Sequence, residues 1–142
     1  MRFSCFVFLC LCLATPALAQ TERRYDDRGR FIGRAETQGG TTRFYDDRGR
    51  YTGRAETQDG RTRFYDERGR YTGRGEAQGG TLRHYDDRGR YTGRDERRDG
   101  TIRRYDDRGA FTGRSEFSGS GTRRDYDDRG RYIGRTEGAK GK

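Results

Sequence analysis

The chain has 142 residues, of which 39% are charged and 27% hydrophobic, and it carries a formal net charge of +9. This length suggests one domain at most. Beyond residue 19 there is no valine or methionine, and Leu82 is the only leucine. An ordinary aliphatic core is therefore excluded, and tyrosine and phenylalanine are the apolar side chains left for burial. Almost all the positive charge is arginine, which stacks on aromatic rings and grips carboxylates with a planar fork.

Residues 1–19 are predicted to be a secretory signal peptide. Arg2 is followed by an apolar run over residues 3–13 and by Ala17-Leu18-Ala19, which places small residues at the positions a signal peptidase recognises. The run is too short to span a bilayer, which takes about 20 residues. We expect cleavage between Ala19 and Gln20, export to the periplasm or the exterior, and no transmembrane segment in the mature chain. A lipid-modified cysteine is the less favoured alternative.

All three cysteines lie inside this predicted signal peptide. The mature chain would therefore contain no disulfide, no thiol nucleophile and no thiolate metal site, although its compartment permits disulfides.

The rest of the chain is built on the decapeptide 45–54, which returns along the sequence. Five copies begin at a spacing of 20 residues, and a sixth, led by Tyr126, begins one residue late. A period of this length indicates one small supersecondary unit stacked on its neighbours. We therefore predict six tandem repeats over residues 20–137 and a disordered basic tail over residues 138–142.

Each repeat reads as a β-hairpin. Short segments rich in Tyr, Phe and Thr are bounded by Gly and Asp, and no apolar residue recurs at helical spacing. The segment 46–49 has Asp first and Gly last, as in a type I turn followed by a glycine bulge. The predicted turn residues are Asp46, Gly49, Asp66, Gly69, Asp86 and Gly89. The fold class expected is all-β, with hairpin repeats forming a meandering, coiled antiparallel sheet. A largely disordered Arg/Tyr-rich chain is the alternative.

The connector between hairpins decides which side the tyrosines face. With three-residue loops at both ends of each hairpin, all repeats show tyrosine on one side; with a two-residue connector the sides alternate. We favour the first, in which Tyr45 faces Tyr51 and Gly53 faces Tyr65, whose ring covers the bare glycine backbone. The extra residue of the sixth repeat is expected in the loop 117–121. The predicted aromatic face comprises Tyr25, Tyr45, Tyr51, Tyr65, Tyr71, Tyr85, Tyr91, Tyr105, Tyr126 and Tyr132.

The motif Tyr-Asp-x-x-Gly-Arg, followed by an aromatic residue and Thr, resembles the YD repeat of bacterial RHS and related shell proteins. The resemblance covers residues 21–137, nearly the whole mature chain. In that family the hairpins spiral into a hollow sheet that encloses cargo, often a toxin. The resemblance implies the hairpin architecture and a short, exported, stand-alone relative without a toxin or processing domain.

The residues offer little support for catalysis. His84 is the only histidine and has no predicted proton-transfer partner. The paired carboxylates after each leading tyrosine fit turn capping better than calcium binding, because the loop offers too few oxygen ligands. We therefore expect no enzyme activity, no metal and no cofactor.

The function expected is that of a non-enzymatic structural or adhesive element of the cell envelope or exterior. The alternative is a binder of anionic polymers: acidic polysaccharide, lipopolysaccharide or, as the least favoured case, nucleic acid. Self-association is a further candidate partnership. The candidate anion-binding residues are Arg48, Arg50, Arg54, Arg68, Arg70 and Arg74.

Overall fold

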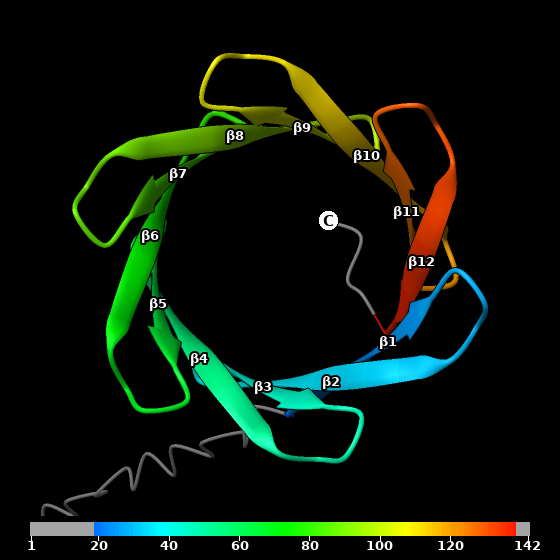
Figure 1. Cartoon of the computed structure of the whole chain (residues 1–142), viewed down its shortest axis with the longest axis horizontal. Coiled ribbons are helices and arrows are strands. Elements are labelled where there is room, and N and C mark those ends of the chain that lie inside the picture. The colour runs from blue at the N-terminus through cyan, green and yellow to red at the C-terminus, as the bar shows by residue number, and fades with distance from the viewer. Residues whose placement is uncertain (1–18, 139–142) are drawn as a thin grey trace, which may run out of the picture.

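The computed structural model describes residues 19–138 and consists of six hairpins arranged in a ring (Figure 1). Of these residues 68% lie in strands, so the all-β prediction is confirmed and the disordered alternative is not what the structure shows. The strands are β1 (Gln20–Asp26), β2 (Phe31–Gln38), β3 (Thr41–Asp46), β4 (Tyr51–Gln58), β5 (Arg61–Asp66), β6 (Tyr71–Gln78), β7 (Thr81–Asp86), β8 (Tyr91–Arg98), β9 (Thr101–Asp106), β10 (Phe111–Phe117), β11 (Thr122–Asp127) and β12 (Tyr132–Glu137).

The sheet closes on itself, which corrects the prediction of a meandering, coiled sheet. Every strand pairs antiparallel with its sequence neighbours, and β1 also pairs with β12. At this seam Arg24 lies opposite Thr136 and Tyr25 opposite Arg135, as Phe64 lies opposite Ala55 and Tyr65 opposite Arg54 at an ordinary junction between repeats. The second strand of the sixth repeat pairs with the first repeat in the same way that the second strand of every other repeat pairs with the repeat after it. Closure therefore needs no special sequence. It also removes both exposed edges.

The predicted turn after each leading tyrosine is confirmed. The amide of Gly49 donates to the carbonyl of Asp46 at 3.1 Å, and the amide of Asp46 donates to the carbonyl of Arg50 at 3.0 Å. Gly49 has a φ of +79°, the left-handed conformation that the turn requires and glycine adopts freely. Tyr45 pairs with Tyr51 across this turn, as expected.

The favoured connector was wrong. Gln58 pairs directly with Arg61, and the two residues between them, Asp59 and Gly60, both have positive φ (+50° and +75°), as in a two-residue type I′ turn. The sixth-repeat connector is the exception: the amide of Gly121 donates to the carbonyl of Ser118 at 3.1 Å, in the three-residue pattern. Its extra residue lies in the loop, as predicted.

Tyrosines nevertheless share one face, because a second irregularity compensates for the short connector. The register shifts between Phe44 and Tyr45, so that Thr52 is an extra residue in β4. This bulge restores the alternation that the two-residue turn would have reversed. The single tyrosine face was therefore expected for the wrong reason.

The predicted neighbour of Gly53 was also wrong. Gly53 lies opposite Asp66, and Arg54 lies opposite Tyr65. A Cβ on Gly53 would stand 2.4 Å from the carbonyl oxygen of Tyr65, and its φ is +147°. Glycine recurs here because neighbouring backbones approach too closely for a side chain, whereas the prediction placed a tyrosine ring over it.

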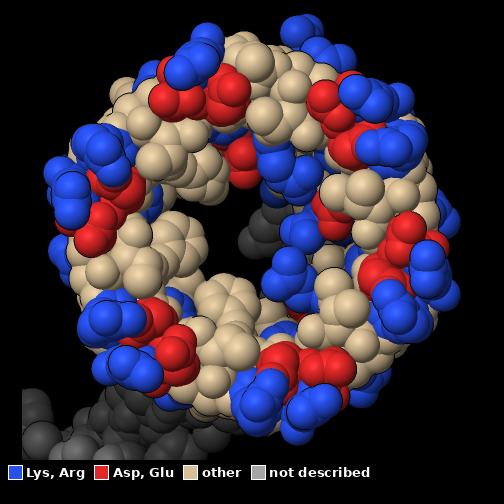
Figure 2. Space-filling model, in the orientation of Figure 1, with Lys and Arg blue, Asp and Glu red and all other residues tan. Residues whose placement is uncertain are grey.

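The two faces of the sheet carry different residues. Thr42, Phe44 and Ala55 share one face, and Arg43 and Tyr45, with Arg54, share the other. The first face is the inner one: a single cavity is lined by Arg24 of β1 and Arg104 of β9, four strands apart, which only the concave side permits. Ring-bearing and arginine side chains extend into the central opening (Figure 2).

Residues 19–138 include no helix of the length and apolar character needed to cross a membrane. Apart from Ala19 and Gly138, the predicted signal peptide and basic tail lie outside the described residues.

Candidate functional site

The outer wall carries a continuous belt of tyrosine and arginine. Within each hairpin two aromatic rings meet edge to face; for Tyr65 and Tyr71 the ring centres are 6.0 Å apart. Between hairpins an arginine stacks on the next tyrosine; the guanidinium carbon of Arg54 lies 4.2 Å from the centre of the Tyr65 ring. Such pairs recur in every repeat, and their arginines are Arg34, Arg54, Arg74, Arg94, Arg114 and Arg135. The belt includes all ten predicted tyrosines, with Phe31 and Phe111 in the two remaining places.

Each belt arginine is also bound to a carboxylate. Arg54 Nε donates to Glu56 at 2.8 Å on the same strand. This bond, and next in importance the nearby Tyr51 hydroxyl, raise the pKa of Arg54 above its ordinary value. Arg54 and its counterpart Arg74 were candidates for anion binding, but their charge is already engaged by Glu56 and Glu76. Their evident role is to hold neighbouring hairpins together.

The turn aspartates act within their own turns. Asp46 Oδ1 accepts the amides of Arg48 at 3.0 Å and Arg50 at 2.8 Å, and Oδ2 accepts Arg50 Nε at 2.7 Å. The hydrogen bond from the Arg50 amide is the largest influence and holds the pKa of Asp46 below its ordinary value; burial raises this pKa, and the Arg50 side chain lowers it further. Asp66 and Asp86 have the same contacts. Arg50 and Arg70, two further anion-binding candidates, are thus paired in the turn.

A second set of arginines on the outer wall has no such partner. These wall arginines are all exposed, and within residues 19–138 none has a carboxylate within the 4.0 Å of an ion pair. They stand on the first strand of each hairpin, two residues before the leading tyrosine. The set comprises Arg23, Arg43, Arg63, Arg83, Arg103 and Arg124. The sequence-based prediction does not include these arginines, although the recurrent Thr-x-Arg-x-Tyr pattern contains them, because it assigned anion binding to the arginines in and after the turn.

The arginines at the turn tips form a third group. Arg48 is exposed, and in the described part of the chain it has no carboxylate partner, whereas Arg68 lies 4.0 Å from Glu67. These two are the only predicted anion-binding residues not committed to a close ion pair.

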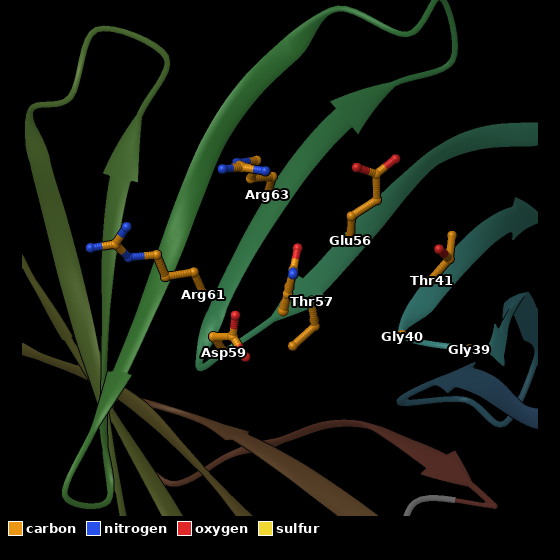
Figure 3. A pocket seen from close by; sticks show the side chains of 9 residues that line it. Gly39, Gly40, Thr41, Glu56, Thr57, Asp59, Arg61 and Arg63 are labelled. Atoms are coloured by element: carbon orange, nitrogen blue, oxygen red, sulfur yellow. The ribbon is translucent and has the colours of Figure 1, made fainter.

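Grooves on the outer wall contain wall arginines. One, of about 630 Å³, lies between the connector at Gly39-Gly40 and strand β5, and its walls include Glu56, Arg61 and Arg63 (Figure 3). A groove of about 390 Å³ recurs two repeats later around Arg103. Each groove presents a guanidinium beside a carboxylate on an exposed, hydrogen-bonding surface.

The inner face differs between repeats, whereas the outer face repeats. The position before each leading tyrosine forms an inner ring of Arg24, Phe44, Phe64, His84, Arg104 and Asp125. Each inner-ring residue lies opposite a residue on the second strand of the preceding hairpin. In chain order these partners are Ala35, Ala55, Gly75, Asp95, Ser115 and Thr136. Repeats that share their outer residues thus differ in the lumen, where Phe and Ala each recur in two neighbouring repeats and Arg in two separate ones.

Polar inner residues gather on one side of the lumen. Arg104 Nη2 lies 3.2 Å from Asp125 Oδ1, and Ser115 donates its hydroxyl to the same carboxylate. Arg123 Nε lies 3.2 Å from Asp125 Oδ1 but makes no hydrogen bond of acceptable geometry, and it is buried. Arg24, exposed on β1, lines the same cavity of about 330 Å³. Two guanidinium groups, those of Arg104 and Arg123, therefore contact one carboxylate, and Arg24 lines the same cavity.

His84 and Asp95 both lie on the inner face, with His84 Nε2 at 3.3 Å from Asp95 Oδ2. In residues 19–138 no group of three or more His, Cys, Asp or Glu side chains could hold a metal ion.

Comparisons with protein-family models and with curated proteins find no match to this chain. The geometry defines its class only as a closed barrel of tandem hairpins. Its resemblance to the YD repeat stays a prediction.

Proposed function

We propose that this is a non-enzymatic, exported repeat protein of the cell envelope or exterior that adheres to acidic polysaccharide through its outer wall. The observation that carries the proposal is the ring of six exposed wall arginines, which have no carboxylate within 4.0 Å in the described residues. Arginine binds carboxylate and sulfate groups through two parallel hydrogen bonds, which suits it to polyanions.

Repetition around the ring supports a polymer as the ligand. One exposed arginine contributes little free energy, because solvent and salt screen its charge. Six at equivalent positions can engage successive charges of one chain, and each further contact then benefits from a high effective concentration. The net charge of +9 also favours approach of a polyanion.

The start of β1 at Gln20 supports export. Cleavage after Ala19 would leave every strand complete, including the Gln20 side chain that donates to the carbonyl of Gly138 at 2.7 Å across the seam. The resemblance to exported YD-repeat proteins points the same way.

Polygalacturonate binding tests the proposal. Protein recovered from cells that express the full chain should bind polygalacturonate at low ionic strength. It should lose most of that affinity by about 0.3 M salt, where the Debye length falls to several ångströms. Uncharged dextran should not bind. Lipopolysaccharide and DNA are assayed in parallel, and tighter salt-dependent binding to DNA than to polygalacturonate would reject the polysaccharide proposal.

A matched pair of variants locates the surface. R43Q/R63Q/R83Q removes three wall charges, and R48Q/R68Q/R88Q removes three charges from the turn tips. We expect the first to weaken polygalacturonate binding at least fivefold more than the second. Equal losses would mean that net charge alone is responsible and that the wall is not the site.

A further inference from the structure

The lumen has two chemically distinct sides that lie opposite each other. Phe44 on β3 and Phe64 on β5 face inward, and in a ring of twelve strands β3 is six strands from β9 and β5 is six from β11. Those two opposite strands carry Arg104 and Asp125. The aromatic and the charged residues of the inner ring therefore face each other across the opening, as the space-filling view shows for rings and arginines (Figure 2).

The lumen is wide enough for a small molecule. Twelve strands spaced about 4.8 Å apart and tilted by about 40° give a backbone diameter of roughly 24 Å. Side chains from both walls narrow this, and an opening remains at the centre of the ring (Figure 2). The cavity on the charged side alone measures about 330 Å³.

The charged side holds two inward carboxylates besides Asp125: Asp95, which lies opposite Arg104, and Glu22, two residues before Arg24 on β1. Arg104 and Arg123 both contact Asp125, each at 3.2 Å, while Arg24 has no carboxylate within 4.0 Å in the described residues. Arg123 is also engaged through Nη2, which donates to Asp125 Oδ2 at 3.4 Å and to Thr136 Oγ1 at 3.2 Å, so within residues 19–138 Arg24 is the inner-ring arginine without an ion pair.

The opposite side offers apolar contact. Phe64 and Leu82 cover the row of small residues beneath them: a Cβ on Gly75 would lie 3.8 Å from the Phe64 ring and 3.0 Å from Leu82. Ala55, in the same row, is 5% exposed. The aromatic faces above this row are placed to receive an apolar group.

We propose that the lumen binds a small organic acid, whose carboxylate is held by Arg24 and Arg104 and whose aromatic body lies toward Phe44 and Phe64. This ligand class follows from the two sides together: an inorganic anion would leave the aromatic side unused, and a neutral aromatic compound would leave Arg24 unpaired. The site is separate from the wall arginines, which point outward from the same strands.

The probe is 2-naphthoate, with 2-naphthalenemethanol as its neutral counterpart and acetate as its carboxylate without a ring. Titration calorimetry on protein expressed from the full chain should detect 2-naphthoate binding. The neutral alcohol and acetate should each bind at least tenfold more weakly. Absence of naphthoate binding, or equal binding of the alcohol, would overturn the proposal.

Adjacent residues provide the matched variants. R24Q/R104Q removes two inward charges, and R23Q/R103Q removes two outward charges from the same strands. We expect the first to weaken naphthoate binding at least tenfold and the second less than twofold. Equal losses would overturn the lumen site.

Arg104 contacts Asp125, so R24Q/R104Q also removes an ion pair of the folded barrel. R24Q alone avoids this, because the Arg24 side chain makes no ion pair in the described residues. It should retain the wild-type circular dichroism spectrum and still weaken binding at least threefold. A folded R24Q with unchanged affinity would also reject the proposal. Polygalacturonate binding should be unaffected by R24Q, so failure here is distinguishable from failure of the proposed function.

Discussion

The guanidinium carbon of Arg135 lies 4.4 Å from the centre of the Tyr25 ring, although these residues belong to the last and the first strand of the barrel. The equivalent distance inside the chain, from Arg74 to Tyr85, is 4.5 Å. The seam is thus held by the same contact as every other junction. The first and last repeats therefore have a neighbouring repeat on both sides, as the central repeats do.

Closure predicts that the first repeat is as important to stability as a central one. In an open sheet Tyr25 would lack a neighbour on one side, so Tyr25→Ala would cost less than Tyr65→Ala. In the closed barrel the two substitutions should lower the free energy of unfolding equally, to within about 0.5 kcal/mol. Urea denaturation followed by circular dichroism measures both. A clearly smaller cost at Tyr25 would contradict the closed ring.

The belt predicts that removing one tyrosine lowers the free energy of unfolding substantially. Tyr65→Ala removes an edge-to-face aromatic pair, a stacked guanidinium and the associated apolar contact, so we expect a loss of about 1.5–3 kcal/mol. Arg48→Ala, at an exposed turn tip, should change stability by under about 0.5 kcal/mol. Thermal melts of the two variants provide the comparison. Similar melting temperatures would show that the belt does not stabilise the barrel.

The close approach at Gly53 predicts a severe effect of one methyl group. Gly53→Ala would place Cβ against the Tyr65 carbonyl oxygen at a φ of +147°, so it should cost more than about 2 kcal/mol. Gly119, in the connector that precedes the sixth repeat, has nothing within 4 Å of an added Cβ and no positive φ, so Gly119→Ala is the control, with a change under about 0.5 kcal/mol. A tolerated Gly53→Ala would mean that the backbones are farther apart.

The turn aspartates predict loss of stability in acid. The pKa values of Asp26, Asp46, Asp66, Asp86 and Asp127 are lowered in the folded chain, chiefly by amide hydrogen bonds. The unfolded chain therefore binds protons first as the pH falls. The stabilisation is present above an unfolded pKa of about 3.9 and is lost as pH drops through the lower folded values.

Melting temperatures measured from pH 7 to pH 2 test this expectation. D46N/D86N should make the acid decline shallower, because two of the five carboxylates with a lowered pKa are removed. D47N/D87N alters the adjacent aspartates, which accept no hydrogen bond in the described residues, and should leave the decline unchanged. An identical profile for both pairs would mean that acid acts elsewhere.

Export predicts a defined N-terminus. Protein isolated from the periplasm or medium should begin at Gln20 by intact mass, with loss of residues 1–19. Recovery only of a species that retains Met1 would reject both the signal peptide and the export on which the proposed function depends.

Local sequence was enough to determine the hairpins. The turn at Asp46 and Gly49, the pairing of Tyr45 with Tyr51 and the loop position of the extra sixth-repeat residue all depend on neighbours a few positions apart, and all three were predicted. The connector was mispredicted because Asp59-Gly60 is compatible with turns of two lengths, and a bulge at Thr52, near the start of the preceding strand, decides which length keeps the tyrosines aligned.

Only the tertiary structure decided closure and the composition of the lumen. Strand stagger allows a hairpin array to spiral or to close, and which occurs depends on the twist summed over all twelve strands, which no single repeat contains. Closure places Arg24 on one cavity with Arg104 and Asp125, which are far from it in the chain, and sets Phe44 and Phe64 opposite Arg104 and Asp125. In the sequence these residues all occupy the position before a leading tyrosine, and that position varies from repeat to repeat. Repetition determined the wall, because each repeat builds its own part of it, while the lumen is shared by all six and exists only once the ring is complete.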